Sequence, residues 1–211
     1  MTDKRLAMTD IRHIVFDIGA VLIHYDPNIP FSRFIPDSDE RKWFFDNVCT
    51  HEWNLAQDAG RTWAEAEAEA IARHPDHAEN IRNFRKYWHE MVSHPYQDSV
   101  DIMTGLIDAG HDVTMLTNFS DETFAQAQEE LFPFLNLPRG VTVSGRVKLI
   151  KPDPRIYELH TKTFDLDPAA TLFIDDNPAN ISSARDYGWR AVLFTDAEQL
   201  RSDLRRHYVN I

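Results

Sequence analysis

Four short segments, far apart in the chain, each end a predicted strand with a residue suited to phosphoryl chemistry. The carboxyl ends of parallel strands share one edge of an open sheet, so such residues would lie close together. This predicted convergence is the main reason to expect an enzyme. The residues are the carboxylate Asp17, the hydroxyl and amide of Thr117 and Asn118, the ammonium of Lys151 and the acidic pair Asp175 and Asp176.

Asp17 follows the apolar run 14–16 and precedes a turn that contains Gly19. A carboxylate in this place can attack a phosphorus or carbon centre and form a covalent aspartyl intermediate. An aspartate at a strand end can equally well make hydrogen bonds within the turn. Asp17 therefore becomes a candidate nucleophile only together with the other motifs.

Thr117, Asn118 and Ser120 stand where a strand passes into a helix. A hydroxyl, an amide and the free N–H groups of a helix N-terminus form a receptor for phosphate oxygens, although helix capping is the competing interpretation. Lys151 precedes the proline-stiffened start of another helix, and its ammonium could neutralise both a nucleophile and a transferring group. The competing interpretation is a solvated surface lysine, such as its neighbour Lys148.

Asp175 and Asp176 follow a buried apolar run and repel each other unless a cation or a proton compensates their charge. Oxygen ligands with water favour Mg²⁺ over zinc or copper. Alternatively, one acid caps the helix near Pro178 and the other is solvated.

The elements that would position these residues alternate along the second half of the chain. A strand with a following turn is expected within 11–23, and strands separated by single helices imply right-handed crossovers and a parallel sheet. The predicted fold class is α/β, a doubly wound parallel sheet. Further strands are expected at 112–116, 140–144, 171–175 and 191–194, with helices at 100–109, 120–131, 153–164, 178–187 and 196–206.

The stretch 26–95 has helical periodicity and no convincing strand, which predicts a helical insert between a core made of 1–25 and 96–211. Within it, Ser38 can cap a helix through Val48, and Thr62 can cap the helix 63–73.

The composition and the net charge limit where the protein can be located and what it can bind. The net charge of -12 works against binding nucleic acid. The single cysteine, Cys49, cannot form an internal disulfide and fits a reducing compartment. The N-terminus lacks the apolar region of a secretory signal, and no apolar run approaches the roughly 18 residues of a membrane span. We expect a cytoplasmic protein without a membrane partner, either a monomer or a homodimer.

Taken in order, the segments resemble the four signatures of the haloacid dehalogenase (HAD) superfamily of hydrolases. They cover essentially the whole chain. The resemblance implies a doubly wound Rossmann-like core, a helical cap inserted after the first signature at 26–95, and an aspartyl-phosphate mechanism with Mg²⁺ on a small phosphorylated substrate. The matching segments are Phe16-Asp-Ile-Gly-Ala-Val-Leu22, Leu116-Thr-Asn118, Lys151-Pro-Asp-Pro-Arg-Ile-Tyr157 and Phe173-Ile-Asp-Asp-Asn177.

The resemblance also implies roles. Asp17 and Lys151 would be catalytic, as nucleophile and balancing charge, and Thr117 and Asn118 would hold the phosphoryl group. The metal ligands it implies are Asp17, the carbonyl of Gly19, and Asp176, with Asp175 assisting directly or through water.

Gly19 departs from most phosphatases of the superfamily, which have an aspartate there as general acid and base. Losing that acid would cost roughly 10²- to 10⁴-fold in rate unless another group replaces it or the leaving group needs no proton. Asp26, His24 or a cap residue such as Asp58 could substitute, and phosphatases that look like this chain at the first signature include ones acting on sugar phosphates.

Two rival functions remain. Halide needs no proton, so a 2-haloacid dehalogenase using the same nucleophile is the strongest competing enzyme, although a metal-free reaction has no use for Asp175 and Asp176. The other rival is a catalytically degenerate member that binds a phosphorylated ligand without turnover.

Overall fold

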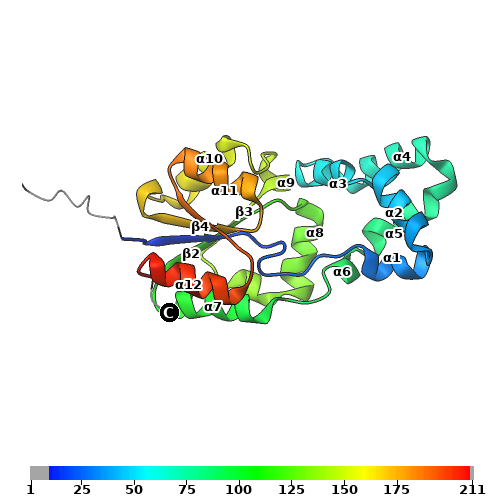
Figure 1. Cartoon of the computed structure of the whole chain (residues 1–211). Coiled ribbons are helices and arrows are strands. Elements are labelled where there is room, and N and C mark those ends of the chain that lie inside the picture. Colours follow the sequence, from blue (N-terminus) through cyan, green and yellow to red (C-terminus); the bar gives the residue numbers. More distant parts are fainter. Residues whose placement is uncertain (1–9, 210–211) are drawn as a thin grey trace, which may run out of the picture.

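A five-stranded parallel sheet with the strand order β3-β2-β1-β4-β5 lies at the centre of the larger part of the molecule (Figure 1). The computed structural model describes residues 10–209. In register, Phe16 of β1 lies between Met115 of β2 and Ile174 of β4, so the first strand is central. The strands are β1 (His13–Phe16), β2 (Asp112–Thr117), β3 (Val141–Val143), β4 (Thr171–Asp175) and β5 (Arg190–Leu193).

Helices cover both faces of the sheet, which confirms the predicted doubly wound α/β fold. In Figure 1, α10 and α11 lie on one face and α7 and α12 on the other. Alternate strand residues divide between the faces: Val15 and Phe173 pack in the cluster under α10 and α11, and Ile14 and Ile174 in the opposite one. The helices of this part are α7 (Gln97–Asp108), α8 (Asp121–Gln126), α9 (Ser144–Val147), α10 (Pro154–Phe164), α11 (Pro178–Tyr187) and α12 (Ala197–Arg206).

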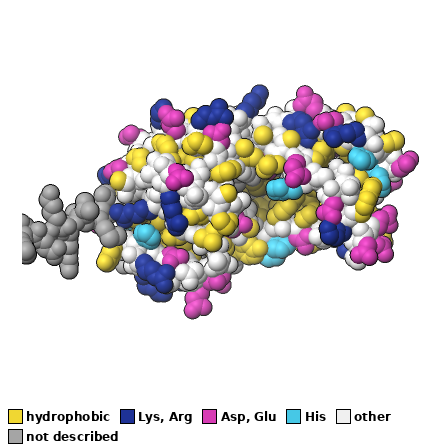
Figure 2. Space-filling view, turned by 45° about the horizontal axis from the view of Figure 1, so that its top comes forward, with side chains coloured by type: hydrophobic (Ala, Val, Ile, Leu, Met, Phe, Trp, Pro, Cys, Tyr) yellow, Lys and Arg dark blue, Asp and Glu magenta, His cyan; other side chains and the backbone are white. Residues whose placement is uncertain are grey.

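The second part of the molecule is a helical segment, residues 28–91, which is described throughout and contains no strand. It projects beyond the carboxyl ends of the strands (Figure 1). Figure 2 shows a recess with hydrophobic side chains between this segment and the part built on the sheet. The helices of the segment are α1 (Asn28–Phe34), α2 (Ser38–Asn47), α3 (His51–Asp58), α4 (Trp63–Arg73), α5 (Ala78–Lys86) and α6 (Trp88–Met91).

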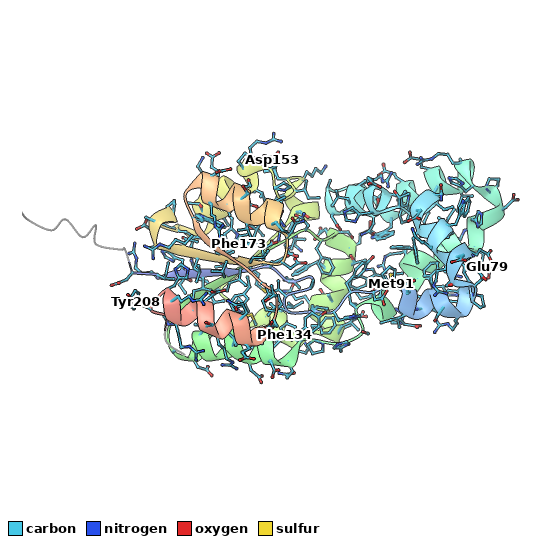
Figure 3. All side chains as sticks on the ribbon, viewed as in Figure 1. Glu79, Met91, Phe134, Asp153, Phe173 and Tyr208 are labelled. Atoms are coloured by element: carbon cyan, nitrogen blue, oxygen red, sulfur yellow. The ribbon has the colours of Figure 1, made fainter. Side chains whose placement is uncertain are left out.

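Two linkers connect the helical segment to the sheet, and they run side by side. The main chain of His24 donates to His94, that of Asp26 to Met91, and that of Tyr96 to Leu22. Met91 lies at this junction in Figure 3. The chain thus enters and leaves the helical segment at one place.

Most predicted helix starts agree with the structure, because the capping residues are explicit in the sequence. Thr62 forms a capping box with Glu65, and Ser120 and Asp153 cap α8 and α10. The expected cap Ser38 is wrong by one residue, since the carboxylate of Asp37 accepts the first N–H groups of α2.

Short one-turn elements complete the fold. The expected helix 120–131 changes at Ala127 into a π-helical turn, η2 (Ala127–Leu131). The others are η1 (Pro75–His77), η3 (Pro133–Asn136) and η4 (Pro168–Ala170). Within residues 10–209, no helix combines the length and the hydropathy needed to cross a membrane.

Candidate active site

The predicted convergence at the carboxyl edge of the sheet is present in the structure. Asp17 directly follows β1, Thr117 is the last residue of β2, and Asp175 is the last residue of β4. Because β1 lies between β2 and β4, these residues come to one place at the centre of the edge. Lys151 reaches them from the loop before α10.

Lys151 is the centre of the charge network. Its Nζ lies 2.8 Å from Oδ1 of Asp17 and 2.7 Å from Oδ2 of Asp175, and it donates to the carbonyl of Leu116 at 3.0 Å. An ammonium has three protons, so these acceptors use all of them. Burial alone would lower the pKa of Lys151, but the two carboxylates together raise it. Lys151 is therefore a fixed, buried positive charge and not a solvated surface lysine.

Asp17 is 7% exposed and keeps one carboxylate oxygen available. The N–H of Ile18 donates to its Oδ1 at 2.7 Å, and this is the oxygen that also faces Lys151. Within residues 10–209 we find no donor to Oδ2. Burial raises the pKa of Asp17 to about 7, with Lys151 opposing this shift and Asp175 adding to it. The arrangement suits a nucleophile held by one oxygen and free to react with the other.

Asp175 is fully buried and saturated with hydrogen bonds. Besides Lys151, it accepts the N–H of Asn177 at 2.8 Å, and the side-chain amide of Asn180 contacts both of its oxygens at 3.0 Å. Sequence analysis missed Asn180. The signal available was a polar residue on the inner side of an otherwise apolar helix start, which does not by itself identify a partner.

The acidic residues at this edge form a group that suits a divalent cation. Oxygen atoms of Asp17, Asp175 and Asp176 all lie within 4.8 Å of one another, and Asp176 is the exposed member. Burial and the neighbouring Asp175 raise the pKa of Asp176. Three carboxylates against the one ammonium of Lys151 leave two negative charges uncompensated, and an all-oxygen donor set fits Mg²⁺. The residues present therefore fit the expected metal.

Thr117 and Asn118 differ in how they are engaged. The hydroxyl of Thr117 is buried, and among residues 10–209 it has no hydrogen-bond partner, so it is free to bind a ligand oxygen. The side-chain amide of Asn118 instead makes two hydrogen bonds to the main chain of Lys151: its oxygen accepts the N–H at 2.8 Å, and its nitrogen donates to the carbonyl at 3.0 Å. This contact gives Asn118 a positioning role that the sequence did not indicate.

Gly19 lies in the turn after β1 beside open space. Apart from Gly19 itself and its two chain neighbours, no heavy atom of residues 10–209 lies within 4 Å of the point where a Cβ would stand. A larger side chain would fit there, so the glycine is not imposed by crowding around it.

The turn between α3 and α4 touches the core next to the site. The hydroxyl of Ser144 donates to the main-chain carbonyl of Asp58 at 2.6 Å and accepts the N–H of Phe119 at 2.9 Å. The indole of Trp63 donates to the hydroxyl of Ser120 at 3.0 Å. The helical segment is thereby held against the residues that follow Thr117 and Asn118.

A cavity of about 410 Å³ lies within the helical segment. None of the predicted site residues lines it, and its wall meets the first linker at Tyr25. The lining mixes rings with polar groups: Tyr25, Pro27, Asn28, Ser38, Lys42, Phe45, Asp46, Cys49, Thr50, His51, Asn54 and Phe84.

Known structures and sequences show the same architecture. A HAD family enzyme from Bacteroides thetaiotaomicron is 22% identical with a TM-score of 0.73, and the match covers 93% of this chain and 99% of that one. The same enzyme has been solved in complex with magnesium and inorganic phosphate, with a TM-score of 0.69 at 21% identity, covering 88% of this chain and 95% of that one.

Two curated relatives match over shorter stretches. (S)-2-haloacid dehalogenase 1 of a Pseudomonas strain is 28% identical over 105 residues, 50% of this chain and 45% of that protein. N-acetylmuramic acid 6-phosphate phosphatase of Pseudomonas putida is 50% identical over 44 residues, 21% of this chain and 20% of that protein. The matches span less than half of either relative's length.

A family model described as haloacid dehalogenase-like hydrolase matches residues 11–188, which is most of the chain. This match agrees with the parallel sheet flanked by helices that the structure shows. The chain therefore belongs to the haloacid dehalogenase-like hydrolases.

Proposed function

We propose that this hydrolase is a Mg²⁺-dependent phosphatase of a small phosphorylated metabolite, working through an aspartyl-phosphate intermediate on Asp17. The observation that carries the proposal is the group of Asp17, Asp175 and Asp176 around a single ammonium, which has an excess of negative charge suited to a divalent cation. The magnesium and phosphate bound by the Bacteroides relative support it.

Each residue has a distinct part in this proposal. Asp17 and Asp176, with the carbonyl of Gly19, would hold the metal, and Asp175 would support it mainly by fixing Lys151. Bound there, Mg²⁺ would offset the charge of a phosphate dianion approaching a carboxylate. The free hydroxyl of Thr117 would bind a phosphoryl oxygen, and Asn118 would keep Lys151 in place.

In the first half of the reaction, the free oxygen of Asp17 attacks phosphorus and the leaving oxygen departs with its electron pair. Water then attacks the aspartyl phosphate, which releases inorganic phosphate and restores the carboxylate. Lys151 holds the other oxygen of Asp17, so the attacking oxygen keeps its direction.

We infer the same division of the chain as the sequence indicated: residues 1–25 and 96–211 as the catalytic core, and 26–95 as a cap. The paired linkers and the docking of the α3–α4 turn beside the site support this division. The cap cavity, with rings beside Lys42, Asp46 and His51, would then accept the part of the substrate that does not react.

A 2-haloacid dehalogenase is the second candidate. Gly19 favours it, because halide departs without a proton, and so does the matching haloacid dehalogenase. The saturated Asp175 and the open Asp176 favour the phosphatase, since attack on an alkyl carbon needs neither.

The test is release of phosphate from p-nitrophenyl phosphate and a panel of sugar phosphates, with Mg²⁺ and with a chelator, beside halide release from 2-chloropropionate. We expect Mg²⁺-dependent phosphate release that Asp17→Asn lowers by ~10⁴-fold or more. Asp76→Asn, the same change at an exposed cap position, should have no effect. Metal-independent halide release would favour the dehalogenase over the phosphatase. Binding of a phosphorylated ligand without turnover would favour a catalytically degenerate member of the family.

A further inference from the structure

The proposed phosphatase needs a proton donor that its first signature lacks. An alkoxide leaving group must be protonated as it departs, and the usual position for the acid is occupied by Gly19. The three substitutes that the sequence offers are His24, Asp26 and Asp58. Their surroundings distinguish between them.

His24 and Asp26 have structural roles in the first linker. The ring of His24 stacks on His94 at 4.7 Å between centroids, and its Nδ1 lies 3.1 Å from the hydroxyl of Ser93. Oδ1 of Asp26 accepts both the main-chain and the side-chain N–H of Asn28, at 2.8 and 2.9 Å. The ring of His24 thus holds the two linkers together, and the carboxylate of Asp26 holds the start of α1.

Asp58 is the last residue of α3 and is docked against the catalytic edge. The hydroxyl of Ser144 donates to its main-chain carbonyl at 2.6 Å, and the main-chain N–H of Ser120 faces its carboxylate and opposes the rise of its pKa. Ser120 comes two residues after Asn118 and three after Thr117. The carboxylate therefore lies beside the segment that would bind the phosphoryl group, on the side from which the cap approaches.

No cation balances Asp58 among residues 10–209. Arg61 in the next turn pairs with Glu69, Arg146 of α9 pairs with Asp121, and the charge of Lys148 acts on Glu65, whose pKa it helps to lower. Tyr25 is the titratable neighbour of Asp58 from the first linker. Burial raises the pKa of its phenol, so Tyr25 is uncharged at neutral pH. Burial raises the pKa of Asp58 to about 7, so it can hold a proton and release it near neutral pH.

We propose that Asp58 is the general acid and base of this hydrolase, taking the part of the carboxylate missing at Gly19; the proposal rests on the phosphatase function proposed above. As Asp17 attacks, the bond from phosphorus to the leaving oxygen breaks and that oxygen takes the proton of Asp58. In the second half, Asp58 removes a proton from water as the water oxygen attacks the aspartyl phosphate. The proton is thereby returned and no further reactant is needed.

The test compares leaving groups in the first turnover, so that hydrolysis of the intermediate does not interfere. Phenol release is followed by stopped flow for aryl phosphates from 2,4-dinitrophenyl phosphate to phenyl phosphate, with wild type, Asp58→Asn and the control Asp76→Asn. The asparagine is of equal size and can still accept the N–H of Ser120. Both esters react with the same fraction of folded enzyme. A folding defect therefore lowers both rates by the same factor and cancels in their ratio.

We expect Asp58→Asn to lower phenol release from phenyl phosphate by about 10²- to 10⁴-fold, and release from the dinitrophenyl ester by less than about 10-fold. Asp76→Asn should match wild type on both. An equal loss on both esters, or no loss on phenyl phosphate, would overturn the assignment of Asp58 while leaving the phosphatase function intact. A wild type without Asp17-dependent release from any ester would overturn the proposed function itself, and this inference with it.

Discussion

The carboxyl edge of the sheet, where Asp17, Lys151 and Asp175 meet, and the helical segment are stabilised by different kinds of contact. At the edge, buried charges meet main-chain groups at fixed distances, with Lys151 bonded to Leu116, Asp17 and Asp175. In the helical segment, rings pack on rings: Phe84 contacts Phe31, Phe45, Trp53 and Trp63 at 5.3–6.4 Å between centroids. Charged contacts depend on both partners being present, whereas apolar packing tolerates changes of shape.

The largest expected effect on stability is at the edge. Lys151→Met leaves two buried carboxylates without their counter-charge, and we expect a loss of about 3–5 kcal/mol in the free energy of unfolding, measured in urea with chelator present. Protonation relieves this repulsion, because carboxyl groups whose pKa is raised in the folded state favour folding at low pH. The loss should be smaller at pH 5 than at pH 8. A loss independent of pH would show that packing, and not charge, dominates the edge.

A buried histidine in the core gives a second case in which a titratable group affects stability. His160 is fully buried between the hydroxyls of Thr114 and Thr142, and burial lowers its pKa to about 3. Below pH 6.5 this histidine binds a proton in the unfolded chain, whereas it stays neutral in the folded chain. The free energy of unfolding should therefore decrease as the pH is lowered, by up to about 1.4 kcal/mol per pH unit. Urea unfolding from pH 6.5 to 4.5 should show a shallower dependence for His160→Asn. Equal slopes would contradict the prediction.

Replacing a ring in the helical segment should have a smaller effect. Phe84→Leu keeps an apolar side chain among the surrounding rings, and we expect a loss of roughly 1–2 kcal/mol. The loss should be the same at pH 5 and pH 8, which separates it from that of Lys151→Met. Thermal unfolding at the two pH values measures this loss. A strong pH dependence would contradict the proposed difference between the helical segment and the edge of the sheet.

The smallest effect belongs to the surface. Arg33 of α1 and Glu90 of α6 form a two-pronged ion pair at 2.8 and 2.9 Å. Exposed pairs contribute little, so Glu90→Gln should cost about 0.2–1 kcal/mol and less in high salt. A larger, salt-independent loss would mean that ion pairing also holds the helical segment together.

The sequence predicted the parallel sheet well, because β2 and β4 end at polar residues and α8, α10, α11 and α12 each begin after a residue that caps them. It could not choose between Asp37 and Ser38, since both are good caps and the chain geometry decides. Nor could it find Asn180 or the pairing of Asn118 with Lys151. These contacts join residues that come together only when α10 and α11 pack on the sheet.

The paired linkers have a consequence for how such a molecule can be rebuilt. Since Leu22 bonds Tyr96 and Ile23 pairs with Pro95, the two ends of the helical segment meet as the two legs of a hairpin would. Any module whose termini lie equally close could be grafted between them without altering the register of β1 in the sheet, because insertions at such a point leave the host backbone connected as before. The helical segment can therefore be exchanged as a unit while the strands, and the residues at their carboxyl ends, stay as they are.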